Sequence, residues 1–247
     1  MSDPTRVRWL SIFLDVPAAD LDREAAFWGT VTGSGTGEPV GDHDEFLPLA
    51  PPDGDPCVWL QRSDDDTLAS HPDLYVEDVV AAAARALELG AEQLSQQAGL
   101  VVLRSPGGLP FCLVRWRGQH TRPGPVGAAG GVVDQLCLDI PPSRYDAEVR
   151  FWADLTGWPH HDDEPVDEFA RLVRPSDVPH AFLLQRLDDE QPTVTTHVDL
   201  AAADREGETE RHLAAGATLL ARNPHWTVLQ DPVGRTYCIT ARKPGDV

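Results

Sequence analysis

Basic residues are scarce in this chain. Its 247 residues contain 20 lysines and arginines against 40 aspartates and glutamates, a formal net charge of −20. Such a charge repels phosphate backbones and anionic lipid surfaces, so nucleic acid and membranes are poor partners. The acidity could attract a cationic ligand, although a strongly solvated, soluble surface is the favoured explanation.

Cysteine is equally sparse. The four cysteines are isolated in the sequence, with no C-x-x-C pair, at Cys57, Cys112, Cys137 and Cys238. This spacing suggests neither a zinc ribbon nor a disulfide framework. We therefore expect reduced, buried thiols.

Patterns for membrane passage and for two common enzyme classes are also missing. No segment approaches the roughly 20 apolar residues that cross a bilayer. The first 20 residues lack a signal-peptide pattern, so we expect a cytoplasmic protein. The glycines of "RSPGGLP" lack the G-x-G-x-x-G spacing of a nucleotide-phosphate loop, and no G-x-S-x-G elbow indicates a serine hydrolase.

What the chain does contain is a long internal repeat. Residues 13–33, "FLDVPAADLDREAAFWGTVTG", return at 137–157 as "CLDIPPSRYDAEVRFWADLTG", with nine identities in 21 positions. Farther on, "HPDL" returns as "HVDL", and "VLRSPGGLPFC" returns as "VLQDPVGRTYC". A period as long as a domain marks a tandem duplication.

The repeat predicts two domains, at residues 1–117 and 131–247. The segment between them, 118–130, is rich in glycine and proline, as linkers are. Within each domain, hydrophobic periodicity predicts two strand-helix-strand-strand-strand units, with one strand of each unit indistinct. In the first half the predicted strands are 7–16, 46–50, 57–62, 71–77, 99–105 and 109–116, and the helices are 20–31 and 78–90.

This order of motifs resembles the vicinal oxygen chelate superfamily, in particular its glyoxalase-like, bleomycin-resistance-related branch in tandem form. The resemblance covers nearly the whole chain apart from the linker and the short ends. It implies an α+β fold of two tandem glyoxalase-like domains, each made of two βαβββ units whose curled mixed sheet forms a cup around a ligand. The superfamily includes isomerases, dioxygenases, epoxide-opening thiol transferases and drug-sequestering proteins, so it restricts function only weakly.

The resemblance also implies four positions at which metal-dependent members hold a divalent ion. They are occupied by Ser11, Gln61, His71 and Cys112 in the first half and by Gln135, Gln185, His197 and Cys238 in the second. Cysteine replaces the family's glutamate at the fourth position, and these side chains supply no carboxylate, which Mg²⁺ and Mn²⁺ prefer. We expect no tightly held metal and no evident general base for isomerisation, with a weakly bound divalent metal as the alternative.

Each candidate ligand residue has a structural alternative. His71 and His197 recur at equivalent sites, and hydrogen bonding within the protein is as reasonable a role for them as ligand contact. Gln61 and Gln185 face the same cup if the strands alternate as predicted, or else satisfy neighbouring backbone groups. The cysteines at the fourth position are favoured as small buried hydrophobic residues.

Several aromatic residues and one acidic segment also have both a functional and a structural interpretation. Trp59 shares a strand face with Gln61 and is a candidate for the cup wall, although core packing is the favoured role. The Phe-Trp pairs at 27–28 and 151–152 sit at core spacing on the predicted helices and are expected to pack. Residues 158–168, with two histidines and several acids, are favoured as a solvated loop over a metal site.

The sequence thus predicts small-molecule binding without a tightly held metal, including sequestration of a ligand or an antibiotic. The second cup is the better candidate because Gln135, Gln185 and His197 are all polar. The alternative is a metal-dependent lyase, isomerase or dioxygenase of the glyoxalase/dioxygenase superfamily, and a purely structural role is a third possibility. The chain is expected to be a monomer or a homodimer, and no catalytic residue is predicted.

Overall fold

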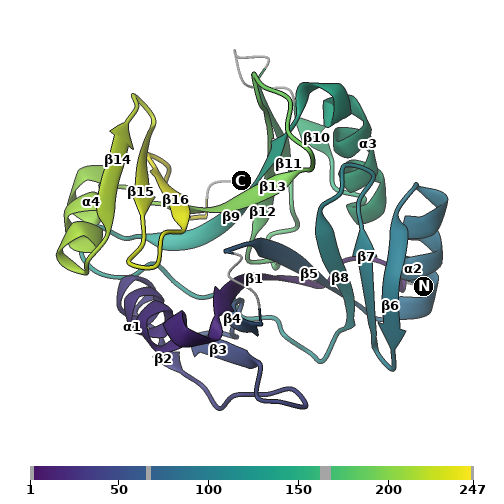
Figure 1. Cartoon of the computed structure of the whole chain (residues 1–247), viewed down its shortest axis with the longest axis horizontal. Helices are drawn as coiled ribbons and strands as arrows, with labels where there is room; N and C mark the ends of the chain where they lie inside the picture. Colours follow the sequence, from purple (N-terminus) through teal and green to yellow (C-terminus); the bar gives the residue numbers. More distant parts are fainter. Residues whose placement is uncertain (1–2, 65–67, 162–167, 246–247) are drawn as a thin grey trace.

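The computed structural model describes residues 3–64, 68–161 and 168–245. Each half of the chain forms one curled eight-stranded sheet with two helices on its outer face (Figure 1). The strand order is β2-β3-β4-β1-β5-β8-β7-β6 in the first sheet and β10-β11-β12-β9-β13-β16-β15-β14 in the second. The two orders are equivalent position by position, which confirms the predicted α+β fold of two tandem glyoxalase-like domains.

The first domain consists of β1 (Trp9–Pro17), α1 (Leu21–Thr32), β2 (Gly35–Thr36), β3 (Phe46–Ala50), β4 (Val58–Ser63), β5 (Ser70–Val76), α2 (Val79–Glu88), β6 (Glu92–Gln97), β7 (Leu100–Arg104) and β8 (Pro110–Arg115). The second consists of β9 (Val132–Ile140), α3 (Tyr145–Thr156), β10 (His160–His161), β11 (Phe169–Leu172), β12 (Ala181–Arg186), β13 (Thr195–Ala201), α4 (Arg205–Ala214), β14 (Thr218–Arg222), β15 (Trp226–Gln230) and β16 (Thr236–Thr240). Short 3-10 turns precede α1 and α3.

The indistinct strands have a physical explanation. β2 and β10 contain only two residues each, too few to show a period. Every residue of β6 and of β14 is exposed, so neither strand carries the apolar alternation of a half-buried strand. All four of these strands lie at the edges of their sheets, where one side has no partner strand.

The central strand of each sheet positions the cup. In β1, Leu10, Ile12 and Leu14 are fully buried, whereas the alternating residues Phe13 and Asp15 point to the concave side. β1 pairs with β4 in parallel and with β5 antiparallel, which sets Phe13 beside His71. β9 pairs with β12 and β13 in the same way.

The two domains pack tightly, and the first unit of each lies beside the second unit of the other (Figure 1). On α1, the Trp28 ring lies 5.2 Å from the Tyr237 ring of β16. The equivalent contact joins Trp152 of α3 to Phe111 of β8 at 5.1 Å. The predicted packing role of the two Phe-Trp pairs is therefore correct, and much of that packing crosses the domain boundary.

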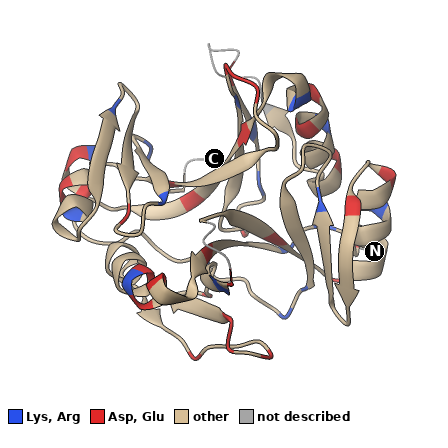
Figure 2. Ribbon diagram, in the orientation of Figure 1, with Lys and Arg blue, Asp and Glu red and all other residues tan. Residues whose placement is uncertain are grey.

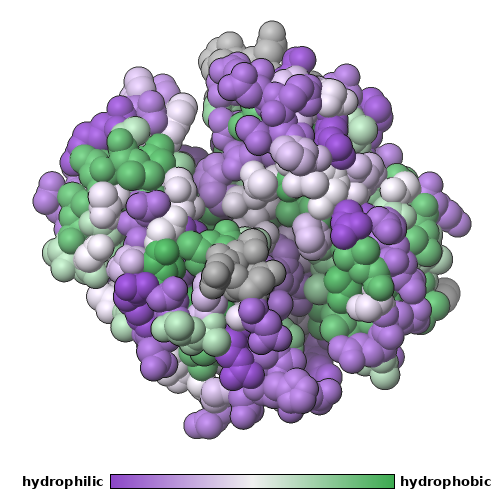
Figure 3. All heavy atoms as spheres, in the orientation of Figure 1, coloured by the Kyte–Doolittle hydropathy of each residue, from purple (hydrophilic) through white to green (hydrophobic). Residues whose placement is uncertain are grey.

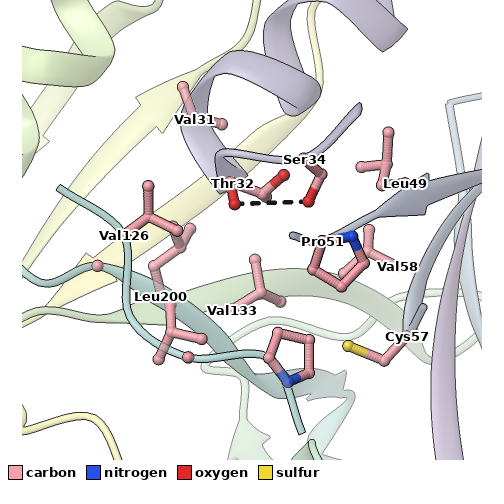
Figure 4. A pocket seen from close by; sticks show the side chains of 14 residues that line it. Val31, Thr32, Ser34, Leu49, Pro51, Cys57, Val58, Val126, Val133 and Leu200 are labelled. Carbon is pink, nitrogen blue, oxygen red and sulfur yellow. Dashed lines mark hydrogen bonds between the residues drawn. The ribbon is translucent and has the colours of Figure 1, made fainter. Parts of the chain in front are cut away.

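A small apolar pocket lies where the linker passes between the domains. It is lined by Val31 and Leu49 of the first domain, Val126 of the linker, and Val133 and Leu200 of the second domain (Figure 4). Its volume is about 30 Å³, enough for about one water molecule. An organic ligand does not fit there, so this pocket belongs to the domain packing.

The surface agrees with the composition. Acidic residues are spread over the helices and the loops (Figure 2), and most of the visible face is hydrophilic (Figure 3). Within the described residues, no helix combines the length and the apolar character needed to cross a membrane. Of the acidic segment 158–168, Asp162, Asp163 and Glu164 lie outside the described residues.

Candidate functional site

Each sheet encloses a cavity on its concave side. The first cavity has a volume of about 880 Å³ and the second about 570 Å³. Both volumes lie in the range of small-molecule pockets, roughly 300–1,000 Å³. The second cavity opens between the lobe of β14–β16 and the lobe of β10–β12, at the notch near the top of Figure 3.

In the first cavity, the strands of the first sheet bring together most of the predicted residues. Those that line it are Trp59, Gln61, His71 and Cys112. Ser11 does not line the cavity, because it is fully buried, whereas Tyr75, with which it interacts, is part of the lining. The first predicted ligand position is therefore closed to a ligand in this half.

In the second cavity, all four predicted residues line the wall: Gln135, Gln185, His197 and Cys238. The side-chain nitrogen of Gln135 is buried and has no hydrogen-bond partner among the described residues. Gln185 accepts a long hydrogen bond of 3.7 Å from the thiol of Cys137. All four predicted positions thus line the second cup, although the first cup is the larger.

An aspartate-histidine-aspartate chain, which the sequence analysis missed, lies at the centre of each cup. In the second cup, His197 Nδ1 lies 2.9 Å from Asp139 Oδ2, and His197 Nε2 lies 3.3 Å from Asp199 Oδ1. In the first cup, His71 lies 3.3 Å from Asp15 and 3.7 Å from Asp73 through the same atoms.

The strand geometry explains both chains. Asp73 and Asp199 follow the histidines by two residues, so each shares a strand face with its histidine. Asp15 and Asp139 come from the neighbouring central strands. A signal for all four was present, because "LD" and "H-x-D-L" recur in both copies of the repeat. The four predicted positions of each cup contain no carboxylate, but these aspartates bring two to each histidine.

Burial and mutual charge shift the pKa values of these groups. Burial raises the pKa of Asp73 to about 6. Burial by itself disfavours a charged imidazole, but the hydrogen bond that His71 donates to Asp15 and the charges of Asp15 and Asp73 leave the pKa of His71 raised. Burial also lowers the pKa of His197, but interactions with Cys137, Asp199 and Asp139 outweigh it and leave that pKa raised. Both imidazoles are therefore set to carry charge more readily than a free histidine.

Each cup also contains a group of side chains that could hold a metal ion. The groups are His71, Asp73 and Cys112 in the first cup and Cys137, His197 and Asp199 in the second, with their ligand atoms within 4.8 Å of one another. Asp73 Oδ1 and Asp199 Oδ1 are buried and have no hydrogen-bond partner among the described residues. An imidazole, a carboxylate and a thiol together fit a divalent transition metal.

The two cups differ beside the histidine. In the first cup, the Phe13 ring stacks on His71 at 5.4 Å and on Trp59 at 5.6 Å, and Phe46 meets Phe13 edge-on at 5.7 Å. In the second cup, Cys137 takes the place of Phe13 and Leu183 that of Trp59. The second cup is also lined by Arg171 and Arg242.

The sequence profile of the family described as "Glyoxalase-like domain" matches residues 11–114 and 135–240. The two matches fall on the two sheets and together span most of the chain. No curated protein matches the chain.

Solved structures of low sequence identity share the fold. The Mn(II)-bound glyoxalase from Novosphingobium aromaticivorans is 20% identical with a TM-score of 0.67, and the match covers 97% of this chain and 83% of that one. The 2,2',3-trihydroxybiphenyl 1,2-dioxygenase from Sphingomonas wittichii is 16% identical with a TM-score of 0.64, and the match covers 95% of this chain and 90% of that one. A variant of homoprotocatechuate 2,3-dioxygenase from Brevibacterium fuscum is 17% identical with a TM-score of 0.67, and the match covers 98% of this chain and 73% of that one.

Proposed function

Because the chain belongs to the glyoxalase-like domain family, we propose that it is a small-molecule-binding protein of that family and that its first cup binds an organic cation with an aromatic or apolar body. The observation that carries this proposal is the aromatic wall beside the Asp15, His71 and Asp73 chain. One side of the cup is thus apolar and flat, and its floor holds two carboxylates around one imidazole.

The charges of the first cup support a cationic ligand. Two carboxyl groups, those of Asp15 and Asp73, flank the single imidazole of His71. Asp73 Oδ1 has no hydrogen-bond partner among the described residues, so an ammonium group can donate to it. The net charge of −20 on the whole protein favours the approach of a cation as well.

The wall supports the remainder of such a ligand. Trp59, Phe13 and Phe46 form a continuous aromatic surface, which suits an apolar or aromatic group through offset or edge-on contacts. The cavity of about 880 Å³ has room for a drug-sized molecule. Binding and sequestration of such a molecule require no metal.

Tyramine and its neutral isostere 4-propylphenol test this proposal by calorimetry at pH 7.5, where Asp73 is ionised. We expect tyramine to bind at least about tenfold more tightly, since a hydrogen bond to a charged group contributes about 1.5–3 kcal/mol. Asp73→Asn should remove most of that preference. Trp59→Ala should weaken both probes, whereas the matched change Leu183→Ala in the second cup should affect neither. Equal affinity of the wild type for the two probes contradicts the proposal.

A second candidate function, that of a metal-dependent lyase, isomerase or dioxygenase, is favoured by the cluster of Cys137, His197 and Asp199. A divalent ion held there would supply Lewis-acid chemistry. Asp139 orients the imidazole of His197 through Nδ1, and Arg171 on the wall can hold an anionic group of the substrate. Turnover of a hemithioacetal or a catechol by metal-supplemented protein, abolished by His197→Ala but kept in His71→Ala, would establish it.

A further inference from the structure

The second cup differs from the first in the number of thiols beside its histidine. β13 lies between β9 and β16, and each of these neighbours contributes one cysteine. Cys137 pairs in register with His197, and Cys238 pairs with Asp199. In the first cup the position of Cys137 is occupied by Phe13, so within the part of the chain that the structure describes a single thiol, that of Cys112, lies near His71.

The donor atoms of the second cup lie close enough to share one ion. The Cys137 sulfur, a ring nitrogen of His197 and a carboxylate oxygen of Asp199 are all within 4.8 Å of one another. Ligands of a tetrahedral zinc ion are about 3.3–3.8 Å apart, given metal–ligand bonds of about 2.0–2.3 Å. Small side-chain rotations therefore close the site. Cys238 lies outside this group of mutually close donors, but it pairs in register with Asp199 and interacts with His197, so it is available as a further donor.

The histidine is already oriented for metal binding. Nδ1 of His197 lies 2.9 Å from Asp139 Oδ2. The other ring nitrogen, Nε2, therefore faces Asp199. A carboxylate that fixes the far nitrogen is the usual outer partner of a metal-ligating histidine. Asp199 is 2% exposed, and its Oδ1 lacks a hydrogen-bond partner among the described residues. Apart from its ion pair with His197, this buried carboxylate oxygen has no partner among the described residues, and a bound cation would offset the cost of burying it.

We propose that Cys137, His197, Asp199 and Cys238 form a binding site for a thiophilic divalent cation, with zinc as the expected ion. Two of these donors, Cys137 and Asp199, lie outside the four positions implied by the family resemblance. Thiol ligands favour zinc over manganese, which prefers oxygen donors. The first cup lacks the second thiol, and its histidine is covered on one face by Phe13. This proposal deepens the second candidate function by naming the ion, and it leaves the ligand of the first cup unchanged.

Cobalt titration of the full chain, stripped of metal with a chelator, tests the site. Cobalt bound to thiolate absorbs through sulfur-to-metal charge transfer, so the spectrum reports the ligands directly. We expect one ion per chain, displacement by zinc, and no displacement by the same concentration of manganese. Cys137→Ser and Cys238→Ser should each diminish the absorption and weaken cobalt binding at least about tenfold, whereas the matched change Cys112→Ser should alter neither.

Alkylation of wild-type protein provides a measurement that needs no variant. Zinc should slow the alkylation of Cys137 and Cys238 at least tenfold, as located by mass spectrometry, and leave Cys112 unchanged. Cobalt binding without charge-transfer absorption, or zinc protection that is equal at all cysteines, overturns the proposal. Zinc binding without turnover supports the zinc site and contradicts the enzyme candidate. The tyramine measurement on metal-free protein tests cation binding by the first cup separately.

Discussion

At the scale of single residues, Asp15 and Asp139 perform the same task in the two cups. Each comes from a central strand and contacts Nδ1 of the histidine on the adjacent strand. The two partners are separated by 56 and 58 positions in the sequence, respectively. An aspartate in this position fixes the orientation of the imidazole and favours its charged form.

Asp15→Asn should therefore lower the pKa of His71. The amide retains a hydrogen-bonding oxygen but loses the negative charge, so the imidazolium is less stabilised. Titration of the His71 ring followed by nitrogen NMR measures the change. The matched variant Asp139→Asn, in the other cup, should leave the His71 titration in place, and an unchanged pKa in Asp15→Asn would contradict the assigned role.

At the scale of elements, the contact between α1 and β16 joins the domains. Tyr237 is fully buried, and its ring packs on Trp28 of the other domain. Its hydroxyl lies 2.8 Å from Nδ1 of His212 on α4, which links helix and strand within its own domain. One side chain thus serves both the interface and the second sheet.

Tyr237→Ala should lower the free energy of unfolding by about 3–5 kcal/mol, the usual cost of removing a large buried ring. Tyr237→Phe should cost only about 1 kcal/mol, since it removes the hydrogen bond to His212 and keeps the packing. Urea denaturation measures both values. Leu220→Ala on the exposed edge strand β14 should change stability by less than about 0.5 kcal/mol. A similar small loss in Tyr237→Ala would show that the interface contributes little.

At the scale of the whole molecule, a buried ionic network connects the domains. Arg235 of the second domain donates to the Glu24 carboxylate at 3.0 Å and to the backbone oxygens of Asp15 and Ala69 at 2.6 Å each. Asp231 Oδ2 lies 3.8 Å from Arg235 Nε, the same atom that donates to Glu24. Arg235 therefore supports the strand ends that carry the first cup.

Burial, followed by the charge of Asp231, raises the pKa of Glu24 to about 7, against the opposing effect of Arg235. A carboxyl with a raised pKa binds its proton more tightly in the folded protein than in the unfolded chain. Its contribution to stability is full below pH 4.5 and is lost as pH rises through 7. The shift corresponds to about 3 kcal/mol at most.

Glu24→Gln should therefore flatten the fall in stability between pH 4.5 and 7, because glutamine does not titrate. Urea denaturation at a series of pH values measures the difference from the wild type. Glu88→Gln, on the exposed side of α2, serves as the control and should follow the wild-type curve. Parallel curves for wild type and Glu24→Gln would show that Glu24 does not govern this dependence.

The sequence alone established the duplication, the order of strands and helices, and the set of side chains that share the concave strand faces. These properties depend on local periodicity and on the comparison of two copies within one chain. For that reason Gln61, His71, Gln135, Gln185 and His197 all proved to line the cups. The short or fully exposed edge strands carry no such period and were missed.

The tertiary structure alone decided which side chains meet. Strand pairing sets Asp15 beside His71 and Cys137 beside His197, and that register depends on contacts between residues more than 50 positions apart. The tertiary structure also buried Ser11 next to Tyr75 and packed Trp28 on Tyr237, because side-chain volume and domain packing act across the whole fold. Local patterns do not encode such distances, so the contacts of the aspartates and of Cys137 with the histidines became evident only in three dimensions, although the aspartates recur visibly in the repeat.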